Sequence, residues 1–341
     1  MAVHGRGYYR LPVLRRAASN SCHRLCDDAQ IMLDSRSPVD VMFESVEFES
    51  QEAVLRGRLY RRTGGPPLGV VVMAHGFSAT ITMTAHRYAE VFQQAGLAVL
   101  LYDHRNFGAS DGEPRQEINP WLQARGYRDA VTFVSTLPGV DPARIALWGD
   151  SFSGDVALVA AGVDQRVAAV VAQVPATGRE QAPPDPDGSL YQALRDTLAD
   201  GDIRGSPDET VGPLPVVSAD QIHAPSLLEP IQALRWFIEY GGRFGTGWEN
   251  RATRVTPKTA APFHAGIAAP HINCPSLMQI SPVDEMPGAN PAVARAVHAA
   301  IRGPKEIAEI DGGHFGLLHH PSAWFDDASA AQRDFFLRKL N

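Results

Sequence analysis

Short apolar runs separated by helical stretches constrain the fold of this chain more than any other feature of its sequence. The runs lie at 69–76, 97–103, 144–150, 167–174 and 275–281, and a further strand is predicted at 304–311. Such runs are typical of parallel strands that are covered by helices on both faces. Helical patterns separate them at 84–95, 121–137, 152–162, 290–301 and within 323–340. The alternation predicts an α/β fold with a doubly wound, mostly parallel sheet.

Two additional strands precede the first buried strand. Residues 41–50 alternate Phe43, Val46 and Phe48 with acidic residues, and residues 53–62 follow after a short turn. Alternation of apolar and polar residues around a short turn is typical of an antiparallel hairpin. We expect this hairpin at one edge of the sheet.

The strand–helix alternation stops for nearly a hundred residues in the second half of the chain. Residues 175–270 are rich in proline, glycine and acids, with helical patterns only at 189–200 and 227–240. We therefore divide the chain into an α/β core, residues 41–174 and 271–341, and an inserted cap, residues 175–270. Ligands of such sheets bind beyond the carboxyl ends of the strands, where the cap is expected to lie.

The first 40 residues do not resemble the core. The first 26 contain five arginines and no acid, and they lack the apolar segment of a secretory signal. We expect a disordered N-terminal extension, with a transit-like peptide as the alternative. Cys22, His23 and Cys26 are too few to hold a metal by themselves.

Charge and cysteine content limit the cellular compartments and the binding partners that fit this chain. A net charge of −7, with no basic stripe on a predicted helix, argues against binding of nucleic acid. Three cysteines in 341 residues are too few for a disulfide framework and fit a reducing compartment. No apolar run reaches the roughly 20 residues of a membrane helix. We expect a cytoplasmic protein with no membrane partner, and we leave open whether it forms a homodimer.

A cluster of small residues surrounds one serine at the end of the third buried strand. In IALWGDSFSGD (145–155), Ser151 lies between the strand and the next helix, flanked by Gly149 and Ser153. A sharp strand-to-helix turn strains its central residue, so the neighbours must be small, and Ser153 stands where glycine is usual. The helix N-terminus favours negative charge there. The segment predicts a nucleophile; an N-cap serine is the alternative.

A base and a carboxylate follow the serine in the chain order that this turn requires. Asp284 comes just after the strand at 275–281, and His314 comes just after the strand at 304–311. Both lie in loops at carboxyl ends of strands, on the same side of the sheet as Ser151. We therefore predict a Ser151–His314–Asp284 triad. Asp311 is a rival to Asp284 but is too close in sequence to His314 to support its ring easily.

Two backbone N–H groups are expected to form an oxyanion hole. One belongs to Phe152, directly after the serine, and the other to Phe77, in HGFSAT (75–80) after an early strand. Within the cap, Trp236, Phe237, Tyr240 and Trp248 are candidate substrate contacts, although aromatic residues at helical spacing also serve as packing.

Taken together, these motifs resemble the α/β-hydrolase superfamily over roughly residues 41–341. HGFSAT, YDHRNFGASDG (102–112), WGDSFSG, Asp284 and GGHFG carry the resemblance. The chain is most similar to the dienelactone-hydrolase-like and X-prolyl-peptidase-like branch. The resemblance implies Ser151 as nucleophile, Asp284 as acid and His314 as base. Dienelactone hydrolases have cysteine at the turn, so the serine here does not favour that particular activity.

We therefore expect a serine hydrolase that needs no cofactor and no metal. It would cleave a carboxylic ester, thioester or lactone of a small-molecule acyl substrate through an acyl-enzyme on Ser151. Acyl transfer and peptidase activity on the same triad are alternatives. A hydrolase-fold binding protein without catalysis is the alternative from a different class.

Overall fold

The computed structural model describes residues 43–62, 65–66, 68–205 and 210–340. All of them belong to one compact unit, Asp40–Asn341. The expected N-terminal extension, with Cys22, His23 and Cys26, lies outside the described residues. Within the described residues, no helix is both long enough and apolar enough to cross a membrane.

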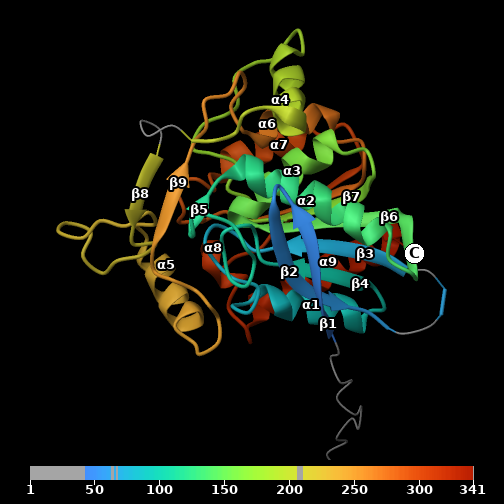
Figure 1. Ribbon diagram of the computed structural model, residues 1–341, viewed down its shortest axis with the longest axis horizontal. Helices are drawn as coiled ribbons and strands as arrows, with labels where there is room; N and C mark the ends of the chain where they lie inside the picture. Colours follow the sequence, from blue (N-terminus) through green and yellow to red (C-terminus); the bar gives the residue numbers. More distant parts are fainter. Residues whose placement is uncertain (1–42, 63–64, 67, 206–209, 341) are drawn as a thin grey trace, which may run out of the picture. The chain divides into compact units, whose positions relative to one another are not determined.

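The core is an eight-stranded sheet whose members are mostly parallel (Figure 1). Its order is β1 (Phe43–Ser50), β2 (Ala53–Tyr60), β4 (Ala98–Tyr102), β3 (Leu68–Ala74), β6 (Val140–Asp150), β7 (Val167–Gln173), β10 (Ser276–Ile280) and β11 (Lys305–Glu309). β1 and β2 form the antiparallel edge hairpin. The other six strands of this sheet, β4, β3, β6, β7, β10 and β11, run parallel to one another. The predicted doubly wound sheet and hairpin are confirmed.

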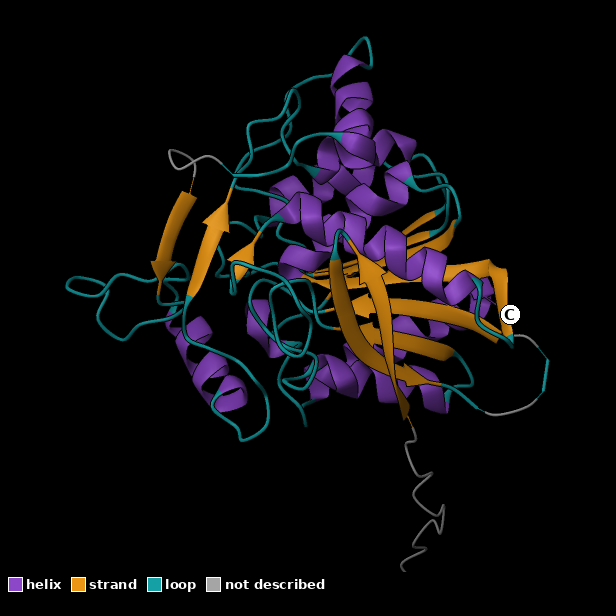
Figure 2. Ribbon diagram, viewed as in Figure 1, coloured by secondary structure: helices purple, strands orange, loops and turns teal. Residues whose placement is uncertain are grey.

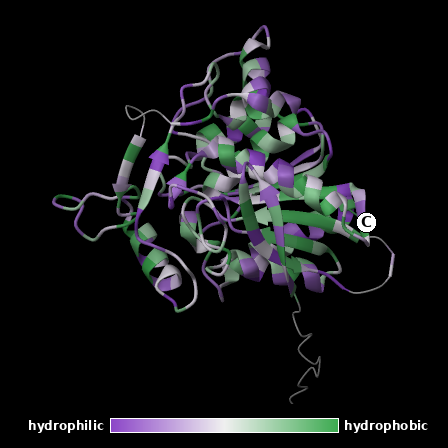
Figure 3. Ribbon diagram, viewed as in Figure 1, coloured by the Kyte–Doolittle hydropathy of each residue, from purple (hydrophilic) through white to green (hydrophobic). Residues whose placement is uncertain are grey.

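Helices cover both faces of the sheet (Figure 2). α2 (Pro120–Ser135), α3 (Ser151–Val163) and α7 (Pro291–Ala300) pack on one face, and α1 (Ala85–Gln94) and α9 (Ala323–Leu340) on the other. Successive residues of one strand point to opposite layers: Val70 and Val72 pack under α2, whereas Val71 and Met73 pack under α1 and α9. This double burial explains the continuous apolar runs, which appear hydrophobic in Figure 3.

The segment between β7 and β10 contains short elements. They are α4 (Ser189–Asp200), β8 (Thr210–Leu214), α5 (Ile231–Trp236) with a π-helical turn (Phe237–Gly241), β9 (Ala252–Val255), and α6 (Ala265–Ala268) with a 3₁₀ turn (Ala269–His271). β9 pairs with both β8 and β5 (Glu117–Ile118) in a second, three-stranded sheet. The sequence did not predict these three strands. The helix expected from 227 begins at Ile231, because Pro230 occupies its N-cap.

Candidate active site

The nucleophile turn lies between β6 and α3. β6 ends at Asp150, which is the N-cap, so Ser151 is the first helical residue and the N-cap alternative for it is wrong. Ser151 has a φ of +51°, in the left-handed region that L residues rarely adopt. A side chain at Gly149 would overlap the carbonyl of Ser153. The turn therefore requires glycine two residues before the serine.

Three side chains from separate loops meet at this turn. Nε2 of His314 lies 2.8 Å from Oγ of Ser151, and Nδ1 of His314 lies 2.8 Å from Oδ2 of Asp284. Asp284 follows β10, and His314 lies in α8 (Gly313–Gly316), after β11. The side chains of His314 and Asp284 are each 2% exposed. Because Nδ1–H donates to the carboxylate, Nε2 is left free to accept the serine proton.

Asp311, the rival carboxylate, does not reach this group. Its side chain is exposed, and Asp284 is the carboxylate that bonds the imidazole. A residue that sequence reasoning missed, Glu285, supports His314 instead: its Oε2 accepts the main-chain N–H of His314 at 2.7 Å. Oγ of Ser281 accepts the N–H of Gly313 at 3.1 Å. Only the position of Glu285 beside Asp284 could have suggested this role.

The two expected oxyanion donors belong to residues that flank Ser151. Phe77 and Phe152 both line the cavity beside the serine, with their rings perpendicular and 5.9 Å apart. Phe77 has a φ of +42°, and no described residue accepts its main-chain N–H. The N–H of Phe152 belongs to the first turn of α3, where helical N–H groups have no partner in the helix. Both donors are thus available to an incoming oxygen.

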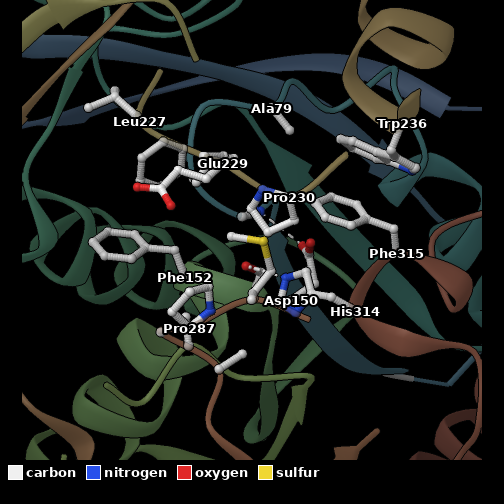
Figure 4. Close-up of a pocket in the computed structure, with 18 of the residues that line it drawn as sticks. Ala79, Asp150, Phe152, Leu227, Glu229, Pro230, Trp236, Pro287, His314 and Phe315 are labelled. Atoms are coloured by element: carbon white, nitrogen blue, oxygen red, sulfur yellow. Dashed lines mark hydrogen bonds between the residues drawn. The ribbon is translucent and has the colours of Figure 1, made fainter. Parts of the chain in front are cut away.

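An apolar cavity of about 380 Å³ opens above the serine and the imidazole. Its volume is in the range of pockets for small molecules. In Figure 4, Trp236 and Phe315 lie on one side of it, and Leu227 and Phe152 lie on the other. Other apolar lining residues include Phe77, Ala79, Leu228, Phe237, Met286 and Leu318. The arrangement suits an apolar group next to the reacting carbonyl.

Of the four aromatic residues expected to contact substrate, Trp236 and Phe237 line the cavity, and Tyr240 and Trp248 do not. Tyr240 is buried beside Trp236, and its hydroxyl hydrogen-bonds the main chain of His320. Trp248 packs against Gly241 and the ring of Phe237, 5.4 Å between centroids, behind the cavity wall. The expectations for Tyr240 and Trp248 are wrong, because both rings pack against other parts of the protein and do not line the cavity.

Charged side chains also border the cavity. Arg179, Glu229 and Arg254 are exposed and line its edge, and none of them forms an ion pair with another described residue. Glu229 is visible in Figure 4 between Leu227 and Phe152. Sequence reasoning missed this charged rim because the three residues are far apart in the chain.

Two buried carboxyl groups lie close to the nucleophile in sequence, one directly before it and one four residues after it. Burial raises the pKa of Asp150 to about 6, against the opposing effects of His75 and His314. Burial also raises the pKa of Asp155 to about 7. Oδ1 of Asp155 accepts the N–H of Ala265 at 3.0 Å, so this residue ties α3 to the start of α6. Neither carboxyl bonds the imidazole of His314.

The fold and the serine–histidine–carboxylate geometry define a serine hydrolase of the α/β class. Residues 65–201 match the family model described as serine aminopeptidase, S33. Thiohydrolase apmlB of Arthrinium phaeospermum is 33% identical over 304 residues, which cover 87% of this chain and 97% of that protein. The chain therefore belongs to the α/β-hydrolase family.

Two further comparisons agree with this assignment. The crystal structure of the α/β hydrolase GrgF from Penicillium sp. sh18 superposes with a TM-score of 0.64 at 27% identity, covering 88% of this chain and 99% of that one. Polyketide transferase claH of Penicillium crustosum is 37% identical over 169 residues. That alignment spans about half of either protein, 48% of this chain and 55% of the relative.

Proposed function

We propose that this enzyme hydrolyses the thioester or ester of an apolar acyl group through an acyl-enzyme on Ser151. The observation that carries the proposal is the unbroken relay from Asp284 through His314 to Ser151 at the base of an apolar cavity. The relative named as a thiohydrolase, aligned over nearly its whole length, supports a thioester in particular.

The geometry supports a two-step reaction. Oγ of Ser151 attacks the substrate carbonyl carbon while its proton passes to Nε2 of His314. The N–H groups of Phe77 and Phe152 stabilise the oxyanion. The imidazolium then protonates the leaving thiol or alcohol as the bond to it breaks. Water, deprotonated by His314, attacks the acyl-serine; the imidazolium then returns the proton to Oγ of Ser151 as the bond to the acyl carbon breaks and the acid is released.

Transfer of the acyl group to an alcohol or amine is the second candidate. It follows the same first step, and the relative named as a polyketide transferase favours it. A peptidase is less well supported, because the charged amino terminus of a peptide would need acidic partners. Glu229 is the one exposed carboxylate among the described lining residues, and two arginines share the rim with it. A cytoplasmic location belongs to the same proposal, since few cysteines fit a reducing compartment.

The test combines covalent labelling with product analysis. A fluorescent alkylphosphonate should label the wild type and leave Ser151→Ala unlabelled. Acyl thioesters and matched oxygen esters of increasing chain length should give free acid, measured by mass spectrometry with and without an added alcohol. A dominant acyl–alcohol product would favour transfer. A folded wild type that neither labels nor turns over any of these substrates would overturn the proposal.

A further inference from the structure

The peptide group between His75 and Gly76 is held at both of its polar atoms by the nucleophile turn. Its carbonyl oxygen accepts from Oγ of Ser153 at 2.5 Å, and its N–H donates to Oδ1 of Asp150 at 3.0 Å. These two residues lie one before and two after Ser151. The C=O and N–H of a trans peptide point in opposite directions, so the two bonds together fix the rotation of the peptide plane.

The next peptide group along the chain carries the N–H of Phe77. A rotation of the His75–Gly76 plane would therefore move this donor relative to Ser151. The fit is close, because a Cβ on Gly76 would lie 2.7 Å from the carbonyl oxygen of Asp150 and 2.8 Å from Cβ of Ser151. The loop then turns at once, with the N–H of Ala79 donating to the carbonyl of Gly76 at 3.1 Å.

A buried histidine completes this arrangement. Nε2 of His104 lies 2.7 Å from Oγ of Ser153, and both side chains are fully buried. Ser153 has one hydroxyl proton, and the His75 carbonyl can only accept, so that proton belongs to the bond with His75. His104 must therefore carry its proton on Nε2 and donate to Ser153. Its Nδ1 has no partner among the described residues, as befits the unprotonated nitrogen.

Burial and contacts with neighbouring rings keep His104 neutral and hold its ring in place. Burial, reinforced by the neighbouring His75, holds its pKa well below the ordinary value. Its ring contacts those of His75, Tyr102 and Tyr127 at centroid distances of 5.5, 5.5 and 5.8 Å. His104 is thus a fixed donor that orients the Ser153 hydroxyl toward the loop.

We propose that Ser153, oriented by His104, and Asp150 are positioning residues that aim the Phe77 N–H at the oxyanion. Ser153 stands where this motif usually has glycine, and the structure gives its hydroxyl a task that glycine cannot perform. The inference rests on the proposed function, because it concerns the oxyanion donor of that reaction.

The experiment compares Ser153→Gly and Ser153→Ala with the wild type. The concentration of active sites is measured by phosphonate titration, and kcat is calculated from it. We expect kcat to fall about 10- to 100-fold while KM stays within about twofold, because the oxyanion interaction forms in the transition state. Ser329→Ala is the matched control: this buried hydroxyl donates to the carbonyl of Asp326 at 3.2 Å in α9, away from the site. It should lower Tm without lowering kcat.

Wild-type kcat in folded Ser153→Gly would overturn the inference, since the hydroxyl would then only fill space. If the Ser153 variants do not fold, Asp150→Asn and Asp150→Ala take their place. Asn keeps an acceptor for Gly76 and should retain at least tenfold more kcat than Ala; equal values would overturn the inference. Ser151→Ala tests the proposed function separately. If the phosphonate labels the wild type and not Ser151→Ala, the proposed function stands, whatever kcat the Ser153 variants have.

Discussion

The hydroxyl of Tyr240 and the main chain of His320 are joined by two hydrogen bonds. The hydroxyl accepts from the N–H of His320 at 2.8 Å and donates to its carbonyl at 3.3 Å. One turn earlier, Nε1 of Trp236 donates to the carbonyl of Leu318 at 3.0 Å. The helical segment that forms one wall of the cavity is thereby fastened to the loop that follows His314.

Tyr240→Phe should loosen this wall. Removing a hydrogen-bonded hydroxyl costs about 1 kcal/mol, and the displaced helix carries Trp236, so we expect a lower Tm and a higher KM for apolar acyl substrates. Tyr191→Phe is the control, because its hydroxyl donates to the carbonyl of Gly162 at 2.8 Å and does not line the cavity. Thermal melts and KM values should separate the two variants; an equal change in KM for both would contradict the expectation.

Asp284→Asn should leave the fold intact and remove most of the activity. The amide can still occupy the position of the carboxylate, but it neither holds the Nδ1–H tautomer of His314 nor stabilises the imidazolium. A loss of about 10⁴-fold in kcat is typical of this change. Asp311→Asn, at the exposed rival carboxylate, should keep wild-type kcat. Steady-state kinetics on both variants is the test. A loss of kcat in Asp311→Asn with wild-type kcat in Asp284→Asn would mean that Asp311 is the acid.

The buried strands and the site residues at their ends were predictable from sequence for one physical reason. Burial on both faces leaves a continuous apolar run, and the ends of parallel strands meet at one edge. That reasoning predicted β3, β4, β7 and β10 to within two residues at each end and β6 from 144 instead of Val140, and it selected Ser151, Asp284 and His314. The predicted triad roles await the kinetic test.

The remaining features depend on contacts between distant parts of the chain. β5, β8 and β9 have two to five residues each, too few for a periodic pattern. Trp236, Tyr240 and Trp248 lie in one stretch of the chain, and their sequence does not indicate which ring faces the cavity. Only the packed structure shows this. The bonds from Ser153 to His75 and His104 span 78 and 49 residues, so local sequence could not reveal them.

Trp236→Leu should shift the preferred acyl chain to greater length. The indole is 3% exposed and forms part of the cavity wall, so a smaller side chain leaves room for additional methylene groups. Each buried methylene contributes about 0.8 kcal/mol, or roughly fourfold in kcat/KM. Ile231→Ala, at an exposed position of the same helix, is the control. A chain-length series of esters measures the shift, and an unchanged optimum would exclude Trp236 from the acyl site.

Asp155→Asn should stabilise the protein more at pH 8 than at pH 5. Burial raises the pKa of Asp155 to about 7, whereas an unfolded aspartate titrates near 3.9. Between these values the folded state binds more protons than the unfolded state, so stability falls as pH rises through about 4 to 7. Asn carries no charge and still offers an acceptor to the Ala265 N–H. The Tm difference from wild type should therefore grow with pH. A pH-independent difference for Asp155→Asn would mean that the carboxyl is not buried as described.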